Sequence, residues 1–367
     1  MSELSAPFAI LAELTHRCPL RCVYCSNPLE LVRRSNELDT GTWRRVLDEA
    51  AELGILQVHF SGGEPTVRKD LEELVAHATG RGLYTNLITS GILSDGEQLI
   101  RLADAGLAHV QISIQDSDDE TGDWIAGYAG AQQKKRDLAV TVADANLALT
   151  INAVMHRHNI DRIESVIDMA LEMGAQRVEI ANVQYYGWGI PNRPNLMPTL
   201  DQLESMNAIV LRRQEELKGV LVIDYVVPDY YARRPKACMN GWARRFLNIT
   251  PSGYVLPCHA AETIPDLVFD NVRGKGLADI WANSTALNRF RGTDWMPEPC
   301  SSCEYRERDW GGCRCQALAL TGSAENTDPV CELSPFHDQV RALAESESQT
   351  REVALTYRSF SKTPETT

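Results

Sequence analysis

The chain has 367 residues, 44% of them apolar, and a formal net charge of −14 at pH 7. This length suits two domains or one large domain, and the acidic balance argues against a protein that neutralises nucleic-acid phosphates. No apolar run approaches the length of a membrane span. The N-terminus lacks the basic and long apolar regions of a secretory signal, so we expect a cytoplasmic protein with reduced thiols.

Short apolar runs alternate with amphipathic stretches from residue 8 onward. The apolar runs predict six strands, at 8–14, 55–60, 83–89, 109–114, 149–154 and 178–183. The amphipathic stretches predict six helices, at 40–53 (with Asp39 or Thr40 as N-cap), 69–80, 94–105, 132–147, 160–173 and 199–217. Repeated βα units of this length form parallel sheets with right-handed crossovers. An eightfold barrel needs about 250 residues and this region has about 210, so we predict an α/β fold with an incomplete, parallel, TIM-like (β/α)6 barrel.

The pattern changes after Pro228, where Gly, Pro, Cys and Trp become frequent and long periodic helices become rare. Such a region buries little apolar surface and needs bound metal to hold it together. We therefore predict a barrel over 1–220, a bridging segment over 221–237, a cysteine-rich domain over 238–340, and a polar, flexible tail over 341–367.

Three cysteines, Cys18, Cys22 and Cys25, follow the first strand in the run THRCPLRCVYC. Three thiolates on a four-iron cube leave one iron without a protein ligand, whereas electron-carrying cubes are normally bound by four. An open metal position is the mark of a catalytic site. The alternatives are a zinc site that adds His16 and a disulfide. Both are weaker because the next cysteine is Cys238 and the thiols are expected to be reduced.

A second motif, SGGEP at 61–65, ends the second predicted strand. The glycines let the backbone approach a ligand closely, and Glu64 offers a carboxylate to an amino group. Reactive groups of parallel α/β barrels gather at the carboxyl ends of the strands. Ser90, Ser113 and Gln115 lie at two further strand ends, where they are either ligand contacts or simple loop caps.

The cysteine loop followed by GGEP resembles the radical S-adenosylmethionine (radical SAM) family. The resemblance implies that Cys18, Cys22 and Cys25 bind a [4Fe–4S] cluster whose open iron chelates the methionine moiety of SAM. It further implies that Gly62, Gly63, Glu64 and Pro65 hold the methionine end, that Tyr24 approaches the adenine, and that Ser90, Ser113 and Gln115 contact the ribose or carboxylate.

The seven C-terminal cysteines resemble a SPASM domain, which carries two auxiliary iron–sulfur clusters in maturases of ribosomally made peptides. The resemblance implies that Cys238, Cys258, Cys313 and Cys315 bind one cluster and that Cys300, Cys303 and Cys331 bind the other. Asp309 stands where the SPASM pattern has a cysteine, and it is either an oxygen ligand or a solvated carboxylate. Each auxiliary cluster is [4Fe–4S] or, for one of them, [2Fe–2S], because both kinds use four ligands. A zinc ribbon is the alternative for these cysteines.

Longer runs, among them HFSGGEPTVRKDL, VQYYGWG, LVIDYVVPDYY and DWGGCRCQALALTG, are similar to the radical SAM family of pyrroloquinoline quinone (PQQ) biosynthesis. This resemblance covers about residues 8–340. It implies an enzyme that uses a 5′-deoxyadenosyl radical to join a glutamate γ carbon to a tyrosine ring carbon in a small precursor peptide. It also implies a small peptide-carrier protein and an external electron donor as partners.

No general base stands out in the sequence. Asn152, His156, Gln184 and Tyr185 lie at or beyond strand ends where substrate would sit, and each is equally well explained as a strand-end cap or packing residue. Two other functions stay open at this point. One is a different SPASM maturase, such as a sulfatase-activating or peptide-decarboxylating enzyme, and the other is a non-enzymatic zinc or iron–sulfur scaffold.

Overall fold

The computed structural model describes residues 4–93, 96–226, 229–350 and 354–360, and one open sheet of nine strands organises them. The strands are β1 (Ala9–Thr15), β2 (Gln57–Gly62), β3 (Tyr84–Thr89), β4 (His109–Ile114), β5 (Ala148–Met155), β6 (Arg177–Asn182), β7 (Val222–Tyr225), β8 (Phe246–Ile249) and β9 (Val255–Leu256). Their order across the sheet is β7-β6-β5-β4-β3-β2-β1-β8-β9.

The first six strands confirm the predicted parallel βα core. Each of β1 to β6 pairs in parallel with its neighbour in sequence, because each connection is a crossover through a helix. The sheet also extends further than predicted. Strand β7 adds to β6 from the segment predicted as a bridge, and β8 from the cysteine-rich region pairs in parallel with β1.

Thirteen α-helices accompany the sheet in the described residues. They are α1 (Thr40–Glu52), α2 (Leu71–Gly80), α3 (Gly96–Asp104), α4 (Asp119–Ala126), α5 (Ala131–Asp144), α6 (Ile163–Glu172), α7 (Gly189–Leu196), α8 (Leu200–Glu216), α9 (Leu277–Asn283), α10 (Thr285–Asn288), α11 (Arg306–Asp309), α12 (Arg314–Thr321) and α13 (His337–Ser348). Short 3-10 turns lie at Arg34–Asn36, Pro65–Val67, Ile160–Arg162, Cys238–Asn240 and Ala261–Thr263. None of these helices is long and apolar enough to cross a membrane.

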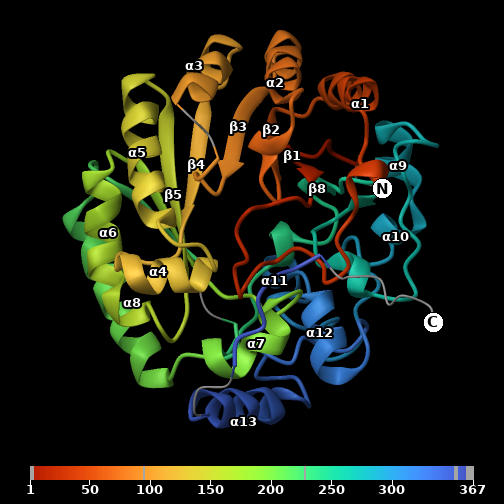
Figure 1. The fold of residues 1–367 in the computed structure, drawn as a ribbon. Helices are drawn as coiled ribbons and strands as arrows, with labels where there is room; N and C mark the ends of the chain where they lie inside the picture. The colour runs from red at the N-terminus through yellow and green to blue at the C-terminus, as the bar shows by residue number, and fades with distance from the viewer. Residues whose placement is uncertain (1–3, 94–95, 227–228, 351–353, 361–367) are drawn as a thin grey trace, which may run out of the picture.

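The helices of the βα units begin and pack as their sequences dictate. Asp39 caps α1 by accepting a hydrogen bond from the Thr42 backbone N–H at 2.7 Å, which satisfies one of the free donors of the first turn. Trp43 and Leu47 of α1 are fully buried against the sheet. Helices α1, α2, α3, α5 and α6 follow the outer face of the strands in an arc (Figure 1).

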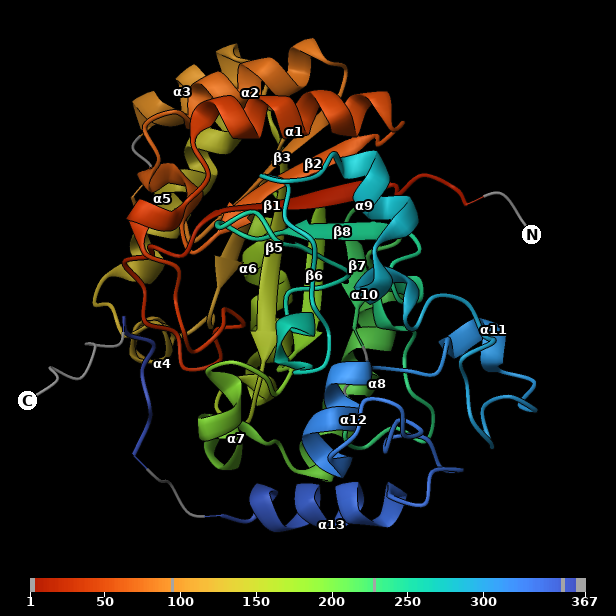
Figure 2. The same cartoon turned by 90° about the vertical axis from the view of Figure 1, so that its right-hand side faces the viewer.

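The cysteine-rich region extends the sheet beyond β1 and packs on the first part of the chain rather than standing apart from it. Strand β8 runs beside β1 (Figure 2), and α9 packs on α1. Helix α13 packs on α7, which belongs to the first part of the chain. The barrel and the cysteine-rich region therefore share one hydrophobic core, which contains Phe60 of β2 as well as Leu247 of β8.

The described part of the C-terminal tail packs along the body of the protein. Helix α13 occupies its first residues, and 354–360 form an extended stretch in which Leu355 and Tyr357 pack against Val23 and Ile125. The flexible tail was predicted from its polar composition, and its flexibility stays a prediction. Within it, this small apolar patch contacts the body of the protein. Residues 351–353 and 361–367 lie outside the described part of the chain.

Candidate active site

Cys18, Cys22 and Cys25 lie together on the wall of a cavity of about 420 Å³ at the carboxyl ends of the strands. Burial raises the pKa of Cys18 above its usual range and, together with Cys25, raises the pKa of Cys22 to about 12. Such thiols ionise when they bind a metal. His16, which the zinc alternative requires, accepts a hydrogen bond at Nδ1 from the Val32 backbone N–H at 2.9 Å and does not line the cavity.

The GGEP segment fixes the start of the cysteine loop. Gly62 has φ +127°, and a Cβ on it would meet the Thr15 carbonyl oxygen at 2.2 Å, so only glycine fits there. The backbone N–H groups of Gly63 and Glu64 donate to the carbonyl oxygens of Thr15 and Arg17 at 2.5 and 2.7 Å. This segment therefore holds the end of β1 against the end of β2.

Glu64 has a different position from the one its motif suggests. Its carboxylate is fully buried and accepts hydrogen bonds from Thr66, Thr89 and Ser90, including the Ser90 backbone N–H at 2.7 Å. Gly62 and Gly63 line the cavity, whereas Glu64 and Pro65 are not among its lining residues. In this structure the Glu64 side chain joins the ends of β2 and β3.

The remaining predicted cofactor contacts all line the cavity. They are Tyr24, Ser90, Ser113 and Gln115. Tyr24 forms a hydrogen bond with Gln115, and its ring lies 5.7 Å from that of His156, centroid to centroid. His156 itself is fully buried and supports Tyr24 from behind, outside the set of lining residues.

The strand register places three polar side chains side by side. Ser113 of β4 pairs with Asn152 of β5, and Asn152 pairs with Glu179 of β6. All three line the cavity. Burial raises the pKa of Glu179, and a hydrogen bond with Asn152 partly offsets that effect. Glu179 was not predicted, although a carboxylate in the middle of the apolar run VEIANV is a signal for it.

Two buried cations approach the cysteine loop from distant segments. Lys135 of α5 is fully buried near Cys22, Cys18 and Glu64, and burial lowers its pKa to about 8. Arg358 of the tail lines the cavity and forms a hydrogen bond with Cys25. Neither was predicted from the sequence.

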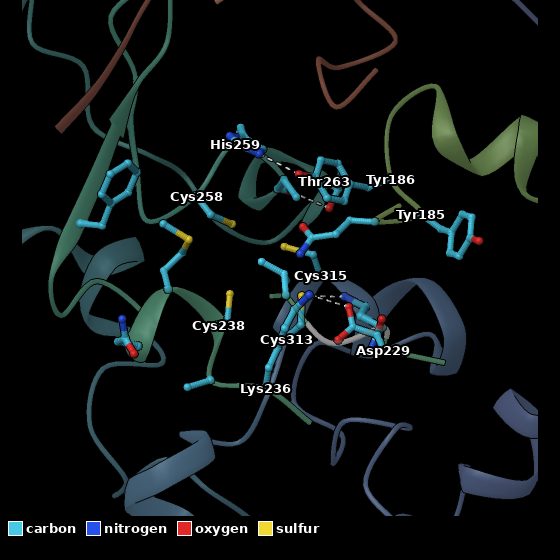
Figure 3. A pocket seen from close by; sticks show the side chains of 18 of the residues that line it. Tyr185, Tyr186, Asp229, Lys236, Cys238, Cys258, His259, Thr263, Cys313 and Cys315 are labelled. Atoms are coloured by element: carbon cyan, nitrogen blue, oxygen red, sulfur yellow. Dashed lines mark hydrogen bonds and ion pairs between the residues drawn. The ribbon is translucent and has the colours of Figure 1, made fainter. Parts of the chain in front are cut away.

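A second cavity, of about 740 Å³, contains a ring of four thiols (Figure 3). The ring consists of Cys238, Cys258, Cys313 and Cys315, and hydrogen bonds link each thiol to two others. The residues of this ring come from the 3-10 turn Cys238–Asn240, the segment after β9 and the start of α12. Four converging thiols match the ligand number of an iron–sulfur cluster and also that of a zinc ion.

The two cavities share one wall. Its members are Glu179, Gln184, Tyr186, Val226, Met239 and His259. His259 and the Tyr186 hydroxyl are 2.7 Å apart. Tyr185 also lines the second cavity, and Lys236 forms an ion pair with the half-buried Asp229 at 3.1 Å. The two cavities are therefore adjacent.

The remaining three cysteines gather with Asp309 near the protein surface. Cys300, Cys331 and Asp309 lie close enough for their charges to interact, and the Arg234 guanidinium interacts with Cys303, Cys331 and Asp309. Arg234 Nη1 lies 3.9 Å from Cys331 Sγ. Asp309 is half-buried at the end of α11, and its Oδ1 accepts the Gly311 backbone N–H at 3.0 Å.

Comparison with known proteins gives the family. The pattern of the Radical SAM superfamily matches residues 12–170, and that of SPASM, an iron–sulfur cluster-binding domain, matches residues 238–304. A relative from Granulibacter bethesdensis named PqqA peptide cyclase is 60% identical over 337 residues, 92% of this chain and 90% of the relative. Another from Rhodopseudomonas palustris with the same name is 58% identical over 355 residues, 96% of this chain and 94% of the relative.

The chain belongs to the PqqA peptide cyclase family. This finding confirms the predicted resemblance to the radical SAM enzymes of PQQ biosynthesis and makes the chain a radical SAM enzyme. Membership of the family excludes the non-enzymatic scaffold.

Solved structures support the fold. SuiB from Streptococcus suis matches with a TM-score of 0.73 when bound to S-adenosylmethionine and 0.75 when bound to its precursor peptide SuiA. Each match is 21% identical and covers 90% of this chain, and the two cover 78% and 76% of SuiB. The α/β fold with an incomplete parallel barrel and a SPASM domain is thereby confirmed, as an open sheet.

Proposed function

We propose that this enzyme joins a glutamate γ carbon to a tyrosine ring carbon within a PqqA-type precursor peptide, an early step of PQQ biosynthesis. The observation that carries the proposal is the shared wall of the two cavities. Because the two cavities are adjacent, a peptide in the larger cavity would present a side chain to the smaller cavity beside Cys18, Cys22 and Cys25. The family of the chain supplies the identity of the peptide.

The smaller cavity suits a cluster and SAM. Cys18, Cys22 and Cys25 would hold a [4Fe–4S] cluster, and the buried Lys135 and Arg358 fit the negative charge of its thiolates and of the SAM carboxylate. Gly62 and Gly63 would bring backbone against the methionine end, while Tyr24, Ser90, Ser113 and Gln115 would surround the nucleoside. When bound, the cluster and SAM together supply one-electron cleavage of SAM to a 5′-deoxyadenosyl radical.

Glu64 acts in this proposal as a positioning residue. Its hydrogen bonds to Thr66, Thr89 and Ser90 hold the β2 and β3 ends at a fixed separation, so that Gly63 and Ser90 face the same cavity. Pro65 starts the turn that carries Thr66 to the Glu64 carboxylate.

Both groups of C-terminal cysteines would bind auxiliary clusters. The ring of Cys238, Cys258, Cys313 and Cys315 would hold one and Cys300, Cys303 and Cys331 the other, with Asp309 as its fourth ligand. We assign [4Fe–4S] to one cluster and [4Fe–4S] or [2Fe–2S] to the other. Because the ring lines the peptide cavity, a cluster held by these four cysteines would supply an acceptor for the electron that the tyrosine ring must lose after the new bond forms.

Residues of the two cavities would position the peptide, accept a proton from it and exclude water. Glu179 is the titratable group that we assign to accept the ring proton, since Asn152 holds it at the boundary of both cavities. Gln184 and Tyr185 would position peptide groups, and the apolar side chains of Ile190, Met239, Phe246 and Leu318 would keep water from the radical. We further propose that a small carrier protein delivers the peptide, that an external donor supplies the electron, and that the enzyme works in the cytoplasm.

The test incubates reduced enzyme, SAM, carrier protein and a precursor peptide deuterated at the glutamate γ carbon, without oxygen. We expect a cross-linked peptide that has lost one deuterium and one hydrogen, together with deuterated 5′-deoxyadenosine. Cleavage of SAM with no change in peptide mass would contradict the proposal and favour a different peptide substrate.

A further inference from the structure

The C-terminal stretch 354–360 returns from helix α13 to the cysteine loop at the opposite end of the sequence. The Asn192 side chain bonds to both backbone polar groups of Thr356. It donates to the Thr356 carbonyl oxygen at 2.7 Å and accepts from the Thr356 N–H at 2.8 Å. The same Asn192 amide donates to the Val23 carbonyl oxygen inside the cysteine loop, at 2.8 Å. One buried side chain thus ties the tail to the loop.

The next residues of the stretch continue this contact. The Arg358 backbone N–H donates to the Arg21 carbonyl oxygen at 3.2 Å. The Tyr357 hydroxyl donates to the Trp124 carbonyl oxygen at 3.0 Å, and the Arg21 guanidinium lies 5.3 Å from the centre of the Tyr357 ring. These contacts hold the Arg358 backbone next to Arg21 and therefore close to Cys22.

The side chain of Arg358 points inward despite its charge. Only 3% of the residue is exposed, and it lines the smaller cavity. Its Nη2 donates to the His16 carbonyl oxygen, and the guanidinium also donates to the Cys25 sulfur. Nε has no hydrogen-bond partner among the residues that the structure describes. Burying a guanidinium is costly unless negative charge compensates it, and the nearby Cys18, Cys22 and Cys25 supply that charge once they ionise.

We propose that Arg358 raises the reduction potential of the cluster bound by Cys18, Cys22 and Cys25. This inference rests on the proposed function, which places the cluster there. Adding an electron to a cluster held by three anionic thiolates increases the negative charge of a buried site. A fixed cation donating to a ligand sulfur stabilises the reduced state, since net charge and hydrogen bonds to sulfur set cluster potentials.

The test compares full-length Arg358→Gln and Arg358→Lys enzymes with the unchanged enzyme in an anaerobic redox titration followed by EPR. The cluster of interest is the one whose signal changes when SAM is added, which separates it from the auxiliary clusters. Arg44→Gln is the matched control, because Arg44 is exposed on α1 and pairs only with the exposed Glu73 in the described residues. Iron and sulfide are counted in every variant.

We expect Arg358→Gln to lower the midpoint potential by about 59 mV or more, which for one electron is a tenfold change in the reduction equilibrium. Arg358→Lys should keep most of the original potential, and Arg44→Gln all of it. Loss of the cluster in Arg358→Gln but not in Arg358→Lys would support the same role of the charge.

Three results would overturn the inference. An unchanged midpoint potential in Arg358→Gln would show that the charge of Arg358 does not affect the cluster. Equal shifts, or equal cluster loss, in Arg358→Gln and Arg358→Lys would assign Arg358 to packing alone. Absence of any SAM-responsive signal in the unchanged enzyme would overturn the proposed function, and this inference with it.

Discussion

The two cysteine-bearing regions that face the cavities are built in opposite ways. The first places three cysteines in one short loop and draws its countercharges, Lys135 and Arg358, from segments far away in sequence. The second draws its four cysteines from distant segments, and hydrogen bonds join them to one another. A local motif therefore selects the chemistry, while long-range packing sets the charge around it.

The largest loss of activity is expected when a cysteine of the first region is replaced. Cys22→Ala removes one of three cluster ligands, so we expect no 5′-deoxyadenosine from reduced enzyme and SAM, measured by chromatography. Circular dichroism should remain that of the unchanged enzyme, since the cysteine loop lies outside the strands and α-helices. Persistent SAM cleavage would show that the loop does not bind the catalytic cluster.

Glu179→Gln tests the role of the wall that the two cavities share. If Glu179 takes the ring proton, cross-linking should fall by about 10²- to 10⁴-fold, the usual contribution of a general base, while SAM cleavage continues. Glu172→Gln, on exposed surface at the end of α6, is the control and should leave both reactions unchanged. An equal loss of cleavage and cross-linking would instead assign Glu179 to SAM binding.

Lys135→Met tests whether the buried cation of α5 contributes to SAM binding beside the cysteine loop. Lys135 donates a hydrogen bond to Gln115, which lines the cavity proposed for SAM. Loss of this charge-assisted contact, worth ~1.5–3 kcal/mol, would release Gln115 and predicts that the KM for SAM rises by roughly tenfold to a hundredfold. Lys134→Met makes the same change at the exposed neighbour and should have no effect. An unchanged KM in Lys135→Met would leave this lysine with a structural role only.

A smaller effect is expected at Asp309. Replacing it by cysteine exchanges an oxygen ligand for sulfur, so the EPR signal and potential of one auxiliary cluster should change while the SAM-responsive signal stays the same. Glu307→Cys, on the same short helix but exposed, is the control. If both variants leave the auxiliary signals unaltered, Asp309 is a solvated carboxylate.

The sequence predicted the parallel core because six apolar runs separated by amphipathic helices leave little choice of topology. Strands β7 and β8 were missed because each has only four residues, and their pairing depends on β6 and β1. Helix α4 lies in a stretch, 116–130, that the sequence left without an assigned element.

The site was predicted only as far as its local motifs. The three cysteines and Gly63 line the cavity, and their roles in binding a cluster and SAM stay predictions. The Glu64 carboxylate instead accepts hydrogen bonds from Thr66, Thr89 and Ser90 and is not among the lining residues. Lys135 had one overlooked signal, because helical periodicity puts it on the buried face with Leu138 and Ala139. No sequence signal pointed to Arg358, since its burial depends on the packing of the C-terminal tail against the cysteine loop near the other end of the sequence.

The proposed division of roles has the cysteine loop cleave SAM and the ring of four thiols serve a later electron transfer from the peptide. Its most direct test replaces Cys258 and Cys315 together by alanine and counts 5′-deoxyadenosine and cross-linked peptide in the same anaerobic reaction. With a chemical reductant supplied, we expect 5′-deoxyadenosine to form while the cross-linked product is lost. A variant that still yields cross-linked peptide in the original proportion to 5′-deoxyadenosine would contradict the account.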